Sequence, residues 1–435
     1  MNSALEPRYL EVWMHDIQVG WICEAGGTTR FVTTESFQSD PRRPTLSLSL
    51  SVPGNEEVTQ AVLNNMFDPA RYNQRGELPP FFAGLLPEGP LRKRLAATRK
   101  NNRDTDDFGI LAAAGQDLPG AVRILPANLG NLTQAARAYG VTGGADNLEI
   151  SVPEAAVEGG AALSGHQNKI ALSSAHEGRR FVLPMQGRLS DIIAKLPAAN
   201  EDGQIFNVYA CMTLAASAGV NVAVCAPRRM ADISLPELVE ALGADTYFLA
   251  VDRFDRGPGG PTHIEDACQL LTLMPSRKYG DQALFVRFLR ALDRLSVRGV
   301  EDIRQFFIRQ VVNTLLGNSD AHLKNFSVIY HNGVNPELSP AYDIVCVAAL
   351  PNFKGYATNV AIDARQRAET LATYKAMAGE ARIAERIVLG AVKSAVDQAQ
   401  ALWPKMLTEL NAPAAVTQEV LSRLQTLPLA NLKPK

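Results

Sequence analysis

The polar stretch 317–330, GNSDAHLKNFSVIY, contains the residues whose types and spacing are best suited to chemistry. It follows a long apolar pattern of helical period at 301–316 and precedes a strand-like run, so we expect a rigid helix to present a polar loop. Within this loop Asp320 and Asn325 have the D-x-x-x-x-N spacing of the catalytic loop of protein kinases. There the aspartate accepts the proton of the substrate hydroxyl and the asparagine binds Mg²⁺. The spacing therefore predicts phosphoryl transfer.

A second carboxylate, Asp343, is expected to complete the site. The pattern predicts a strand at 326–330, a turn at 331–333 and a returning strand at 337–342. Such a hairpin would bring Asp343 back beside Asn325. Carboxylate and amide oxygens are hard ligands that suit Mg²⁺ when it bridges the β- and γ-phosphates of ATP.

Each of these residues also has an ordinary structural explanation. Asp320 could lie in the turn after the helix, His322 could be a packing histidine, and Asp343 could be a loop carboxylate. The joint order of helix, Asp, Asn, hairpin and second Asp is what favours a kinase site. A serine-hydrolase site made of Ser319, Asp320 and His322 is disfavoured, because three neighbours in one loop do not readily align as nucleophile, base and orienting group.

Three upstream segments could bind the nucleotide. Residues 163–170, LSGHQNKI, place one glycine before a strand and could either donate hydrogen bonds to phosphates or form a surface hairpin. Lys195 lies in an apolar strand, where its ammonium needs a partner such as an ATP phosphate, unless the side chain reaches water at the strand edge. Residues 247–255, YFLAVDRFD, could be the hinge beside the adenine or an ordinary edge strand.

The composition is that of a globular protein. The chain has 435 residues, 46% hydrophobic and 20% charged, which suffices for two or three packed lobes. Its 43 Lys and Arg against 45 Asp and Glu disfavour direct binding to nucleic acid. Five scattered cysteines favour reduced thiols in the cytoplasm. No segment approaches the ~20 apolar residues that span a bilayer, so we expect a soluble, unprocessed protein without membrane contact.

The order of the expected elements indicates an α+β fold. Apolar residues alternate from Tyr9 to Val52, with a turn at Gly26–Gly27 and the cleanest alternation at 45–52, which predicts a β-rich start. Helices and turns follow as far as residue 115, and the Ala-, Gly- and Asn-rich segment from about 126 to 160 reads as a connector. The later part is mainly helical. We expect strands at 169–172 and 191–196, and helices at 204–218, 301–316, 367–378, 381–403 and 413–427.

Short motifs along nearly the whole chain resemble the HipA family of bacterial toxin kinases. In the first part they are Val12-Trp13 with Val19-Gly20, LSLS at 46–49, LLPE at 85–88, Asp107-Phe108 and GAV at 120–122. In the second part they are SGHQNK at 164–169, IIAKLP at 192–197, DRFDR at 252–256, EDACQ at 265–269, SDAHLKN at 319–325 and AYDI at 341–344. Their order and spacing both fit the family.

The resemblance implies a protein-kinase-like two-lobe fold and a serine/threonine protein kinase that uses ATP and Mg²⁺. The implied parts are a HipA-like N-terminal subdomain at 1–126, a connector at 127–160, the nucleotide-binding part of the kinase core at 161–256, and a helical C-terminal lobe with the catalytic loop at 257–435. Asp320 would be the catalytic base, and Asn325 and Asp343 would bind the metal. The implied ATP-binding residues are Ser164, Gly165, His166, Gln167, Asn168, Lys169, Lys195, Asp252, Arg253, Phe254, His322, Leu323, Lys324, Asn325, Tyr342 and Asp343.

The resemblance also implies partners. Family members pair with a small DNA-binding antitoxin, HipB, so contact with DNA would be indirect. They phosphorylate aminoacyl-tRNA synthetases where the substrate is known, which would link this chain to growth arrest and persistence. The alternatives from other classes are a catalytically silent protein that binds an antitoxin or repressor, and a small-molecule kinase of the aminoglycoside or choline type.

Two positions depart from the family pattern. The serine that is usually autophosphorylated is Ala162 here, which leaves Ser164 as the candidate autophosphorylation site. The helix that usually offers a glutamate to the ATP-binding lysine has Val208 at that place, within Asn207-Val208-Tyr209. The sequence therefore leaves the partner of Lys195 open.

Overall fold

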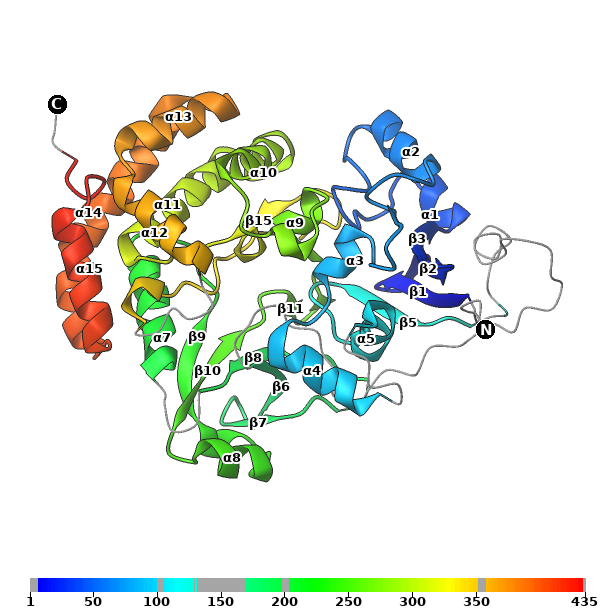
Figure 1. Cartoon of the computed structure of the whole chain (residues 1–435), viewed down its shortest axis with the longest axis horizontal. Coiled ribbons are helices and arrows are strands. Elements are labelled where there is room, and N and C mark those ends of the chain that lie inside the picture. The colour runs from blue at the N-terminus through cyan, green and yellow to red at the C-terminus, as the bar shows by residue number, and fades with distance from the viewer. Residues whose placement is uncertain are drawn as a thin grey trace. The chain divides into compact units, whose positions relative to one another are not determined.

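The computed structural model describes residues 7–99, 105–128, 130, 169–185, 187–197, 203–350 and 357–432 (Figure 1). These residues form two compact units. Unit 1 draws on Met1–Ile192, Asp255–Lys278 and Ile329–Asn335, and unit 2 on Ile193–Phe254, Tyr279–Val328 and Pro336–Lys435. The predicted connector 127–160 lies almost wholly outside the described residues, and the domain boundaries stay a prediction.

Unit 1 begins with an antiparallel five-stranded sheet. Its strands lie in the order β4-β3-β2-β1-β5 and are β1 Arg8–Met14, β2 Ile17–Ala25, β3 Thr28–Thr33, β4 Tyr72–Asn73 and β5 Val122–Pro126. The predicted turn at Gly26–Gly27 is confirmed, with φ of +57° and +77°, values that glycine adopts without strain. The sheet packs its apolar face on a core that includes Phe31, Phe81 and Phe82.

The prediction of a strand at 45–52 is wrong. Leu46, Leu48 and Leu50 are buried as the alternation suggested, but the backbone turns, with Leu50 N–H donating to Ser47 O at 3.0 Å. The tertiary environment explains the difference. The carboxylate of Glu265 accepts hydrogen bonds from the Ser47 hydroxyl at 2.6 Å and from Leu48 N–H at 2.9 Å, and these bonds hold a turn rather than a strand.

Short helices and hairpins make up the rest of unit 1. The helices are α1 Glu35–Ser39, α2 Glu56–Asn64, α3 Pro80–Gly84, α4 Gly89–Thr98, α5 Asp107–Ala114 and α9 Ala267–Leu270. The strands are β6 Lys169–Ala175, β7 Arg180–Val182, β11 Arg256–Gly257, β12 Gly260–Pro261 and β13 Ile264–Asp266. The strand predicted at 169–172 is therefore confirmed as the start of β6.

Unit 2 contains a small sheet with a helix against it. Strands β8 Ile192–Lys195, β10 Tyr247–Asp252 and β9 Cys225–Arg229 lie side by side in that order. Helix α7 Gly203–Ser217, predicted at 204–218, packs against β9 and β10. The short helix α8 Pro236–Leu242 lies between β9 and β10 in the chain.

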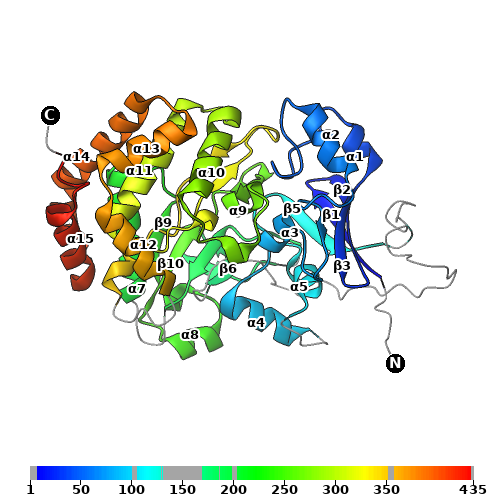
Figure 2. The same cartoon turned by 45° about the horizontal axis from the view of Figure 1, so that its top comes forward.

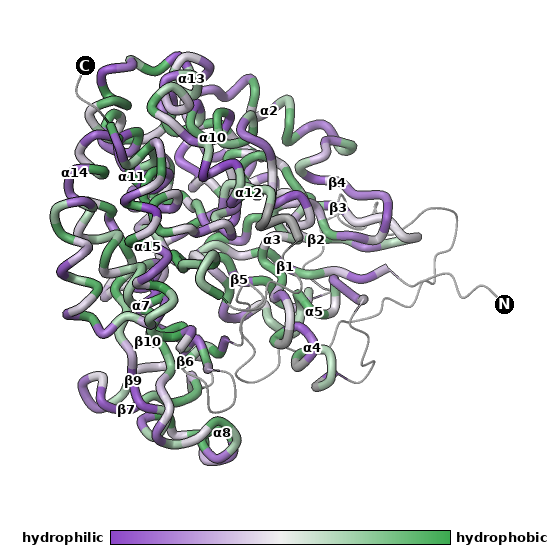
Figure 3. Tube along the Cα trace, turned by 60° about the vertical axis from the view of Figure 1, so that its left-hand side comes forward, coloured by the Kyte–Doolittle hydropathy of each residue, from purple (hydrophilic) through white to green (hydrophobic). Residues whose placement is uncertain are grey.

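The helices of unit 2 pack around α11. They are α10 Gln282–Leu295, α11 Val300–Leu316, α12 Ala357–Ala368, α13 Leu371–Ala381, α14 Glu385–Glu409 and α15 Ala414–Thr426. Figures 1 and 2 show α11 among α10, α14 and α15, all of which it contacts. Along α14 hydrophobic and hydrophilic segments follow one another, as expected of a helix with one buried face, whereas α11 is buried over most of its length (Figure 3).

The C-terminal helices confirm two predictions and correct a third. The helices predicted at 381–403 and 413–427 correspond to α14 and α15. The helix predicted at 367–378 is wrong at its start, because Thr370 is the N-cap of α13 and separates it from α12. Among the described residues no helix is long and apolar enough to cross a membrane.

Candidate active site

The loop that contains Asp320 begins where α11 ends. Gly317 closes the helix in the left-handed conformation, φ +69° and ψ +33°, as the sequence predicted. A Cβ at Gly317 would lie 2.7 Å from Nε of Arg423 and 2.9 Å from Cβ of Ala348, so both the backbone and the packing require glycine. The buried helix therefore fixes the direction in which the loop leaves.

Asp320 accepts a hydrogen bond from a tyrosine. The hydroxyl of Tyr279 donates to Oδ1 of Asp320 at 2.5 Å. The ring of Tyr279 also packs edge-on against His322, with 5.1 Å between ring centroids. Tyr279 thus contacts two residues of the predicted catalytic loop and orients the carboxylate that would act as base.

The predicted hairpin is present in a shorter form. Strand β14 Ser327–Ile329 is followed by β15 Glu337–Leu338, and Ser339 N–H donates to Ser327 O at 2.9 Å. The hydroxyl of Tyr342 donates to Lys324 O at 2.7 Å and lies 2.6 Å from the Ser327 hydroxyl. These contacts join the end of the hairpin to the catalytic loop, so Asp343 follows a residue that is anchored there.

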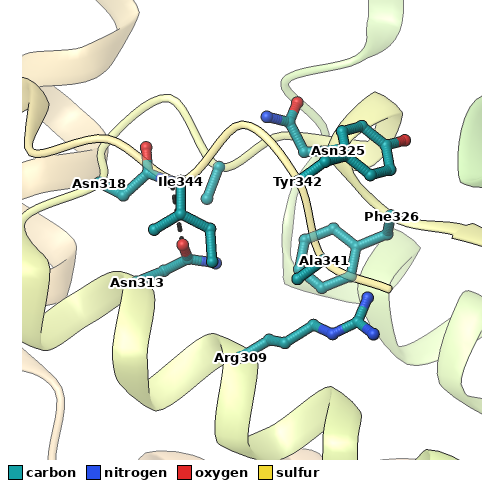
Figure 4. Close-up of a pocket in the computed structure, with 9 residues that line it drawn as sticks. Arg309, Asn313, Asn318, Asn325, Phe326, Ala341, Tyr342 and Ile344 are labelled. Atoms are coloured by element: carbon teal, nitrogen blue, oxygen red, sulfur yellow. Dashed lines mark hydrogen bonds between the residues drawn. The ribbon is translucent and has the colours of Figure 1, made fainter. Parts of the chain in front are cut away.

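A pocket lies between α11 and the loop (Figure 4). Both Asn325 and Tyr342 line it. Arg309 reaches from α11 toward Ala341 and donates to Ser339 O. Burial lowers the pKa of Arg309 to about 10, so its guanidinium stays protonated at neutral pH. It places a fixed positive charge under the segment that leads to Asp343.

Lys195 and Asp343 form an ion pair. The ammonium of Lys195, which is only 5% exposed, contacts Oδ1 of Asp343. The structure thereby identifies a carboxylate partner for the lysine, a point that the sequence left open. Asp343 itself has a φ of +60°, a left-handed conformation that Asp tolerates better than most residues.

The other predicted ATP-binding residues of unit 2 lie near this loop or in the strand beside Lys195. Phe254 follows β10 and packs on Tyr342 with 5.8 Å between ring centroids. Asp252 is exposed at the end of β10 and Arg253 is buried. Leu323, Lys324 and His322 are all buried within the loop.

The remaining predicted residues belong to unit 1 or lie outside the described residues. Lys169 begins β6 in unit 1. Ser164, Gly165, His166, Gln167 and Asn168 lie outside the described residues, as does Ala162. The assignment of these residues to ATP stays a prediction.

The oxygen donors of unit 2 are compatible with a magnesium ion that is shared with a nucleotide. Asn325 and Asp343 are both partly exposed and offer an amide and a carboxylate oxygen. Among the described residues no three His, Cys, Asp or Glu side chains gather to hold a metal. Mg²⁺ is commonly held by one or two carboxylates together with substrate phosphates, so a small donor set of this kind is sufficient.

Sequence reasoning missed three residues of the site. Tyr279 and Arg309 gave no signal, because Tyr279 precedes α10, Arg309 belongs to the helical pattern of α11, and both reach the site only through the fold. Asn207 was noted only beside the missing glutamate, yet its carboxamide bonds both backbone polar groups of Cys346. A buried polar residue on an apolar helix face was the signal that could have identified Asn207.

Two family models match the chain. The model of the HipA-like C-terminal domain matches residues 161–403, and the model of the HipA N-terminal domain matches residues 10–125. Together they include every residue of the candidate site described above.

Full-length relatives and a solved structure agree with these matches. Y4dM of Sinorhizobium fredii, provisionally named a kinase, is 32% identical over 412 residues, 93% of each chain. Y4mE of the same organism, also provisionally named a kinase, is 29% identical over 374 residues, 79% of each chain. The HipA chain of Shewanella oneidensis, solved with HipB and operator DNA, aligns over 97% of this chain and 96% of its own, with a TM-score of 0.66 and 20% identity. That likeness confirms the predicted α+β, kinase-like fold.

Proposed function

Because the chain belongs to the HipA family, we propose that it is an ATP- and Mg²⁺-dependent serine/threonine protein kinase and the toxin of a toxin–antitoxin pair. The observation that carries the proposal is that Asp343, which is paired with Lys195, follows Tyr342, whose hydroxyl bonds Lys324 O in the loop that contains Asp320 and Asn325. This is the residue set that phosphoryl transfer requires: a base, oxygen donors for the metal and a cation for the phosphates.

The reaction follows from the positions of these groups. A substrate hydroxyl beside Asp320 gives its proton to that carboxylate while its oxygen forms a bond to the γ-phosphorus. The bond between the γ-phosphorus and the β,γ-bridging oxygen breaks, and ADP leaves with that electron pair. Tyr279 holds the carboxylate of Asp320 in place.

Lys195 and Asp343 would exchange partners when nucleotide binds. The ammonium of Lys195, now on Asp343, is free to neutralise a phosphate once Asp343 turns to the metal. Bound Mg²⁺ would neutralise charge on the β- and γ-phosphates. The ion pair therefore balances the charges of Lys195 and Asp343 in their partly buried surroundings until a phosphate and the metal replace it.

The proposed partners are a HipB-like antitoxin and a protein substrate, with an aminoacyl-tRNA synthetase as the first candidate. The Shewanella oneidensis relative was solved with HipB and operator DNA. Lys and Arg do not exceed Asp and Glu in this chain, so we propose that it reaches DNA only through the antitoxin, and that it acts in the cytoplasm.

Two measurements test the proposal. Purified wild-type protein should consume ATP in a Mg²⁺-dependent manner and arrest growth when expressed, and Asp320→Gln should lose both effects while still binding ATP. If Asp320→Gln arrests growth as strongly as the wild type, the chain acts as an interaction protein instead. If ATP turnover responds to an added aminoglycoside or choline rather than to protein, the small-molecule kinase is the better account.

A further inference from the structure

Asn207 ties helix α7 to the segment that follows Asp343. Its Nδ2 donates to Cys346 O at 3.0 Å, and Cys346 N–H donates to its Oδ1 at 2.9 Å. Asn207 is 2% exposed and Cys346 is fully buried. One carboxamide therefore satisfies both backbone polar groups of a residue that lies outside regular helix and strand.

This pair of hydrogen bonds fixes orientation as well as distance. Two bonds from one planar amide to one backbone residue form a closed ring, so the segment cannot rotate about a single contact. The thiol of Cys211, one turn further along α7, also donates to Oδ1 of Asn207 at 3.4 Å. Removing the amide would leave the buried N–H of Cys346 without its partner, whereas Cys346 O would still accept from Ala349 N–H at 3.3 Å.

The anchored segment is short and is held at both ends. Asp343, which lies three residues before Cys346, pairs with Lys195. On the other side Ala348 N–H donates to Gly317 O at 3.1 Å, at the end of α11. A shift of Cys346 is therefore passed to Asp343, which already has a left-handed φ of +60° and little conformational freedom.

Val208, the residue after Asn207, stands where protein kinases have a glutamate that joins this helix to the nucleotide site. Protein kinases couple the helix that corresponds to α7 with the nucleotide site through an ion pair between a helix glutamate and the phosphate-binding lysine. In this chain the position that resembles the glutamate is Val208, which is 2% exposed and has no charge to offer Lys195. The helix still contacts the site, but through Asn207 and the Asp343 segment.

We propose that Asn207 is a positioning residue that sets the place of Asp343 from α7, and that this amide contact replaces the helix-to-lysine ion pair in this chain. The inference rests on the proposed function, since it concerns the same metal and nucleotide site. If so, the position of α7 controls the affinity of Asp343 for a divalent metal. Lys195 needs no ion-pair partner on α7 in this account and pairs either with Asp343 or with the phosphates.

The test is the Mg²⁺ dependence of nucleotide binding in Asn207→Leu, a variant that keeps the side-chain volume and loses both hydrogen bonds. Loss of a residue that orients a metal ligand typically weakens metal affinity by about 10–100-fold. We expect the Mg²⁺ concentration for half-maximal binding of a non-hydrolysable ATP analogue to rise by about that factor. The affinity for the analogue without metal should stay within about twofold of the wild-type value, because the Asn207 side chain bonds the backbone of Cys346 and not Lys195.

Gln269→Leu is the matched control. Gln269 is also a buried carboxamide with both ends bonded, accepting from Asp266 N–H at 2.8 Å and donating to Phe81 O at 2.8 Å, but it lies in unit 1. Gln269→Leu should lower the free energy of unfolding about as much as Asn207→Leu does, without changing the Mg²⁺ dependence of nucleotide binding. An equal shift in both variants would show a general loss of stability and overturn the proposal.

A measurement on the wild type covers the case in which Asn207→Leu does not fold. Amide hydrogen exchange at Cys346 should slow when Mg²⁺ and the analogue are added together, and should not slow with the analogue alone. Unchanged exchange, or an unchanged Mg²⁺ dependence in folded Asn207→Leu, overturns the inference and leaves the kinase proposal standing. Wild-type protein that binds no nucleotide would overturn both.

Discussion

The hydroxyl of Tyr279 donates a 2.5 Å hydrogen bond to Oδ1 of Asp320. Tyr279 lies two residues before Asp281, the N-cap of α10, so the start of that helix fixes the phenol. The predicted base thus has Oδ1 held by the protein in a fixed direction.

Tyr279→Phe should lower the rate of phosphate transfer by about 10–100-fold, because a hydrogen bond to a charged group contributes roughly 1.5–3 kcal/mol. The KM for ATP should change less than kcat, since the hydroxyl that is removed bonds the predicted base. Steady-state kinetics with a protein substrate measure this separation. An increase in the KM for ATP with unchanged kcat would place Tyr279 in nucleotide binding instead.

The pair of Lys195 and Asp343 should contribute to stability in the absence of ligand. We expect a coupling energy of about 1–3 kcal/mol from a double-mutant cycle with Lys195→Met and Asp343→Ala, less than for a fully buried pair because the Asp343 side chain is 28% exposed. Urea unfolding of the four proteins gives this value. Asp343→Ala should also raise the Mg²⁺ concentration needed for ATP binding. Additive effects of the two substitutions would show that the ion pair does not hold the site together.

Glu265 should make the stability of unit 1 depend on pH. Burial raises the pKa of this carboxyl to about 7, although hydrogen bonds from Ser47, Tyr330 and Leu48 N–H oppose the rise. The folded state therefore keeps a proton that the unfolded chain releases near its ordinary value of 4.5. The stability linked to this group is fully present below that value and is lost as the pH rises through about 7.

Glu265→Gln imitates the protonated carboxyl and should remove this dependence. The free energy of unfolding of the wild type relative to Glu265→Gln should fall between pH 5 and pH 8, as measured by urea unfolding at several pH values. Glu57→Gln, a change on the exposed surface of α2, serves as the control. Parallel curves for wild type and Glu265→Gln would mean that Glu265 is ionised throughout this range.

Ser164 should carry any autophosphorylation, since Ala162 has no hydroxyl at the position that the family usually modifies. Both residues lie outside the described structure, so this prediction rests on the sequence. A phosphate on Ser164 would bring roughly −1.5 to −2 charges to a loop expected to bind the phosphates of ATP, and nucleotide affinity should fall. Mass spectrometry after incubation with Mg²⁺ and ATP, with Ser164→Ala and Asp320→Gln beside the wild type, measures it. If active wild-type protein carries no phosphate at Ser164, this mode of control is absent.

The local parts of the site could be predicted from the sequence, and the distant parts could not. Asp320, Asn325 and the C-cap Gly317 were predictable because one helix, one loop and one hairpin determine their places over a short stretch of chain. Tyr279 was not, because its contact with Asp320 depends on how α10 and α11 pack. The same limit explains the wrong strand at 45–52, where the alternation of leucines correctly indicated burial.

The most direct test of the kinase site is a phosphoproteomic comparison of cells that express wild-type protein with cells that express Asp320→Gln at the same level. The account predicts phosphoserine or phosphothreonine on at least one cellular protein in the wild type, and a loss of about 10²–10⁴-fold in its rate of formation in the variant, the range for removal of a general base. The same new phosphorylation sites in both samples would contradict the assignment of Asp320 as the base. No new phosphorylation sites in either sample, in cells arrested by the wild type, would contradict the proposal that this protein is a protein kinase.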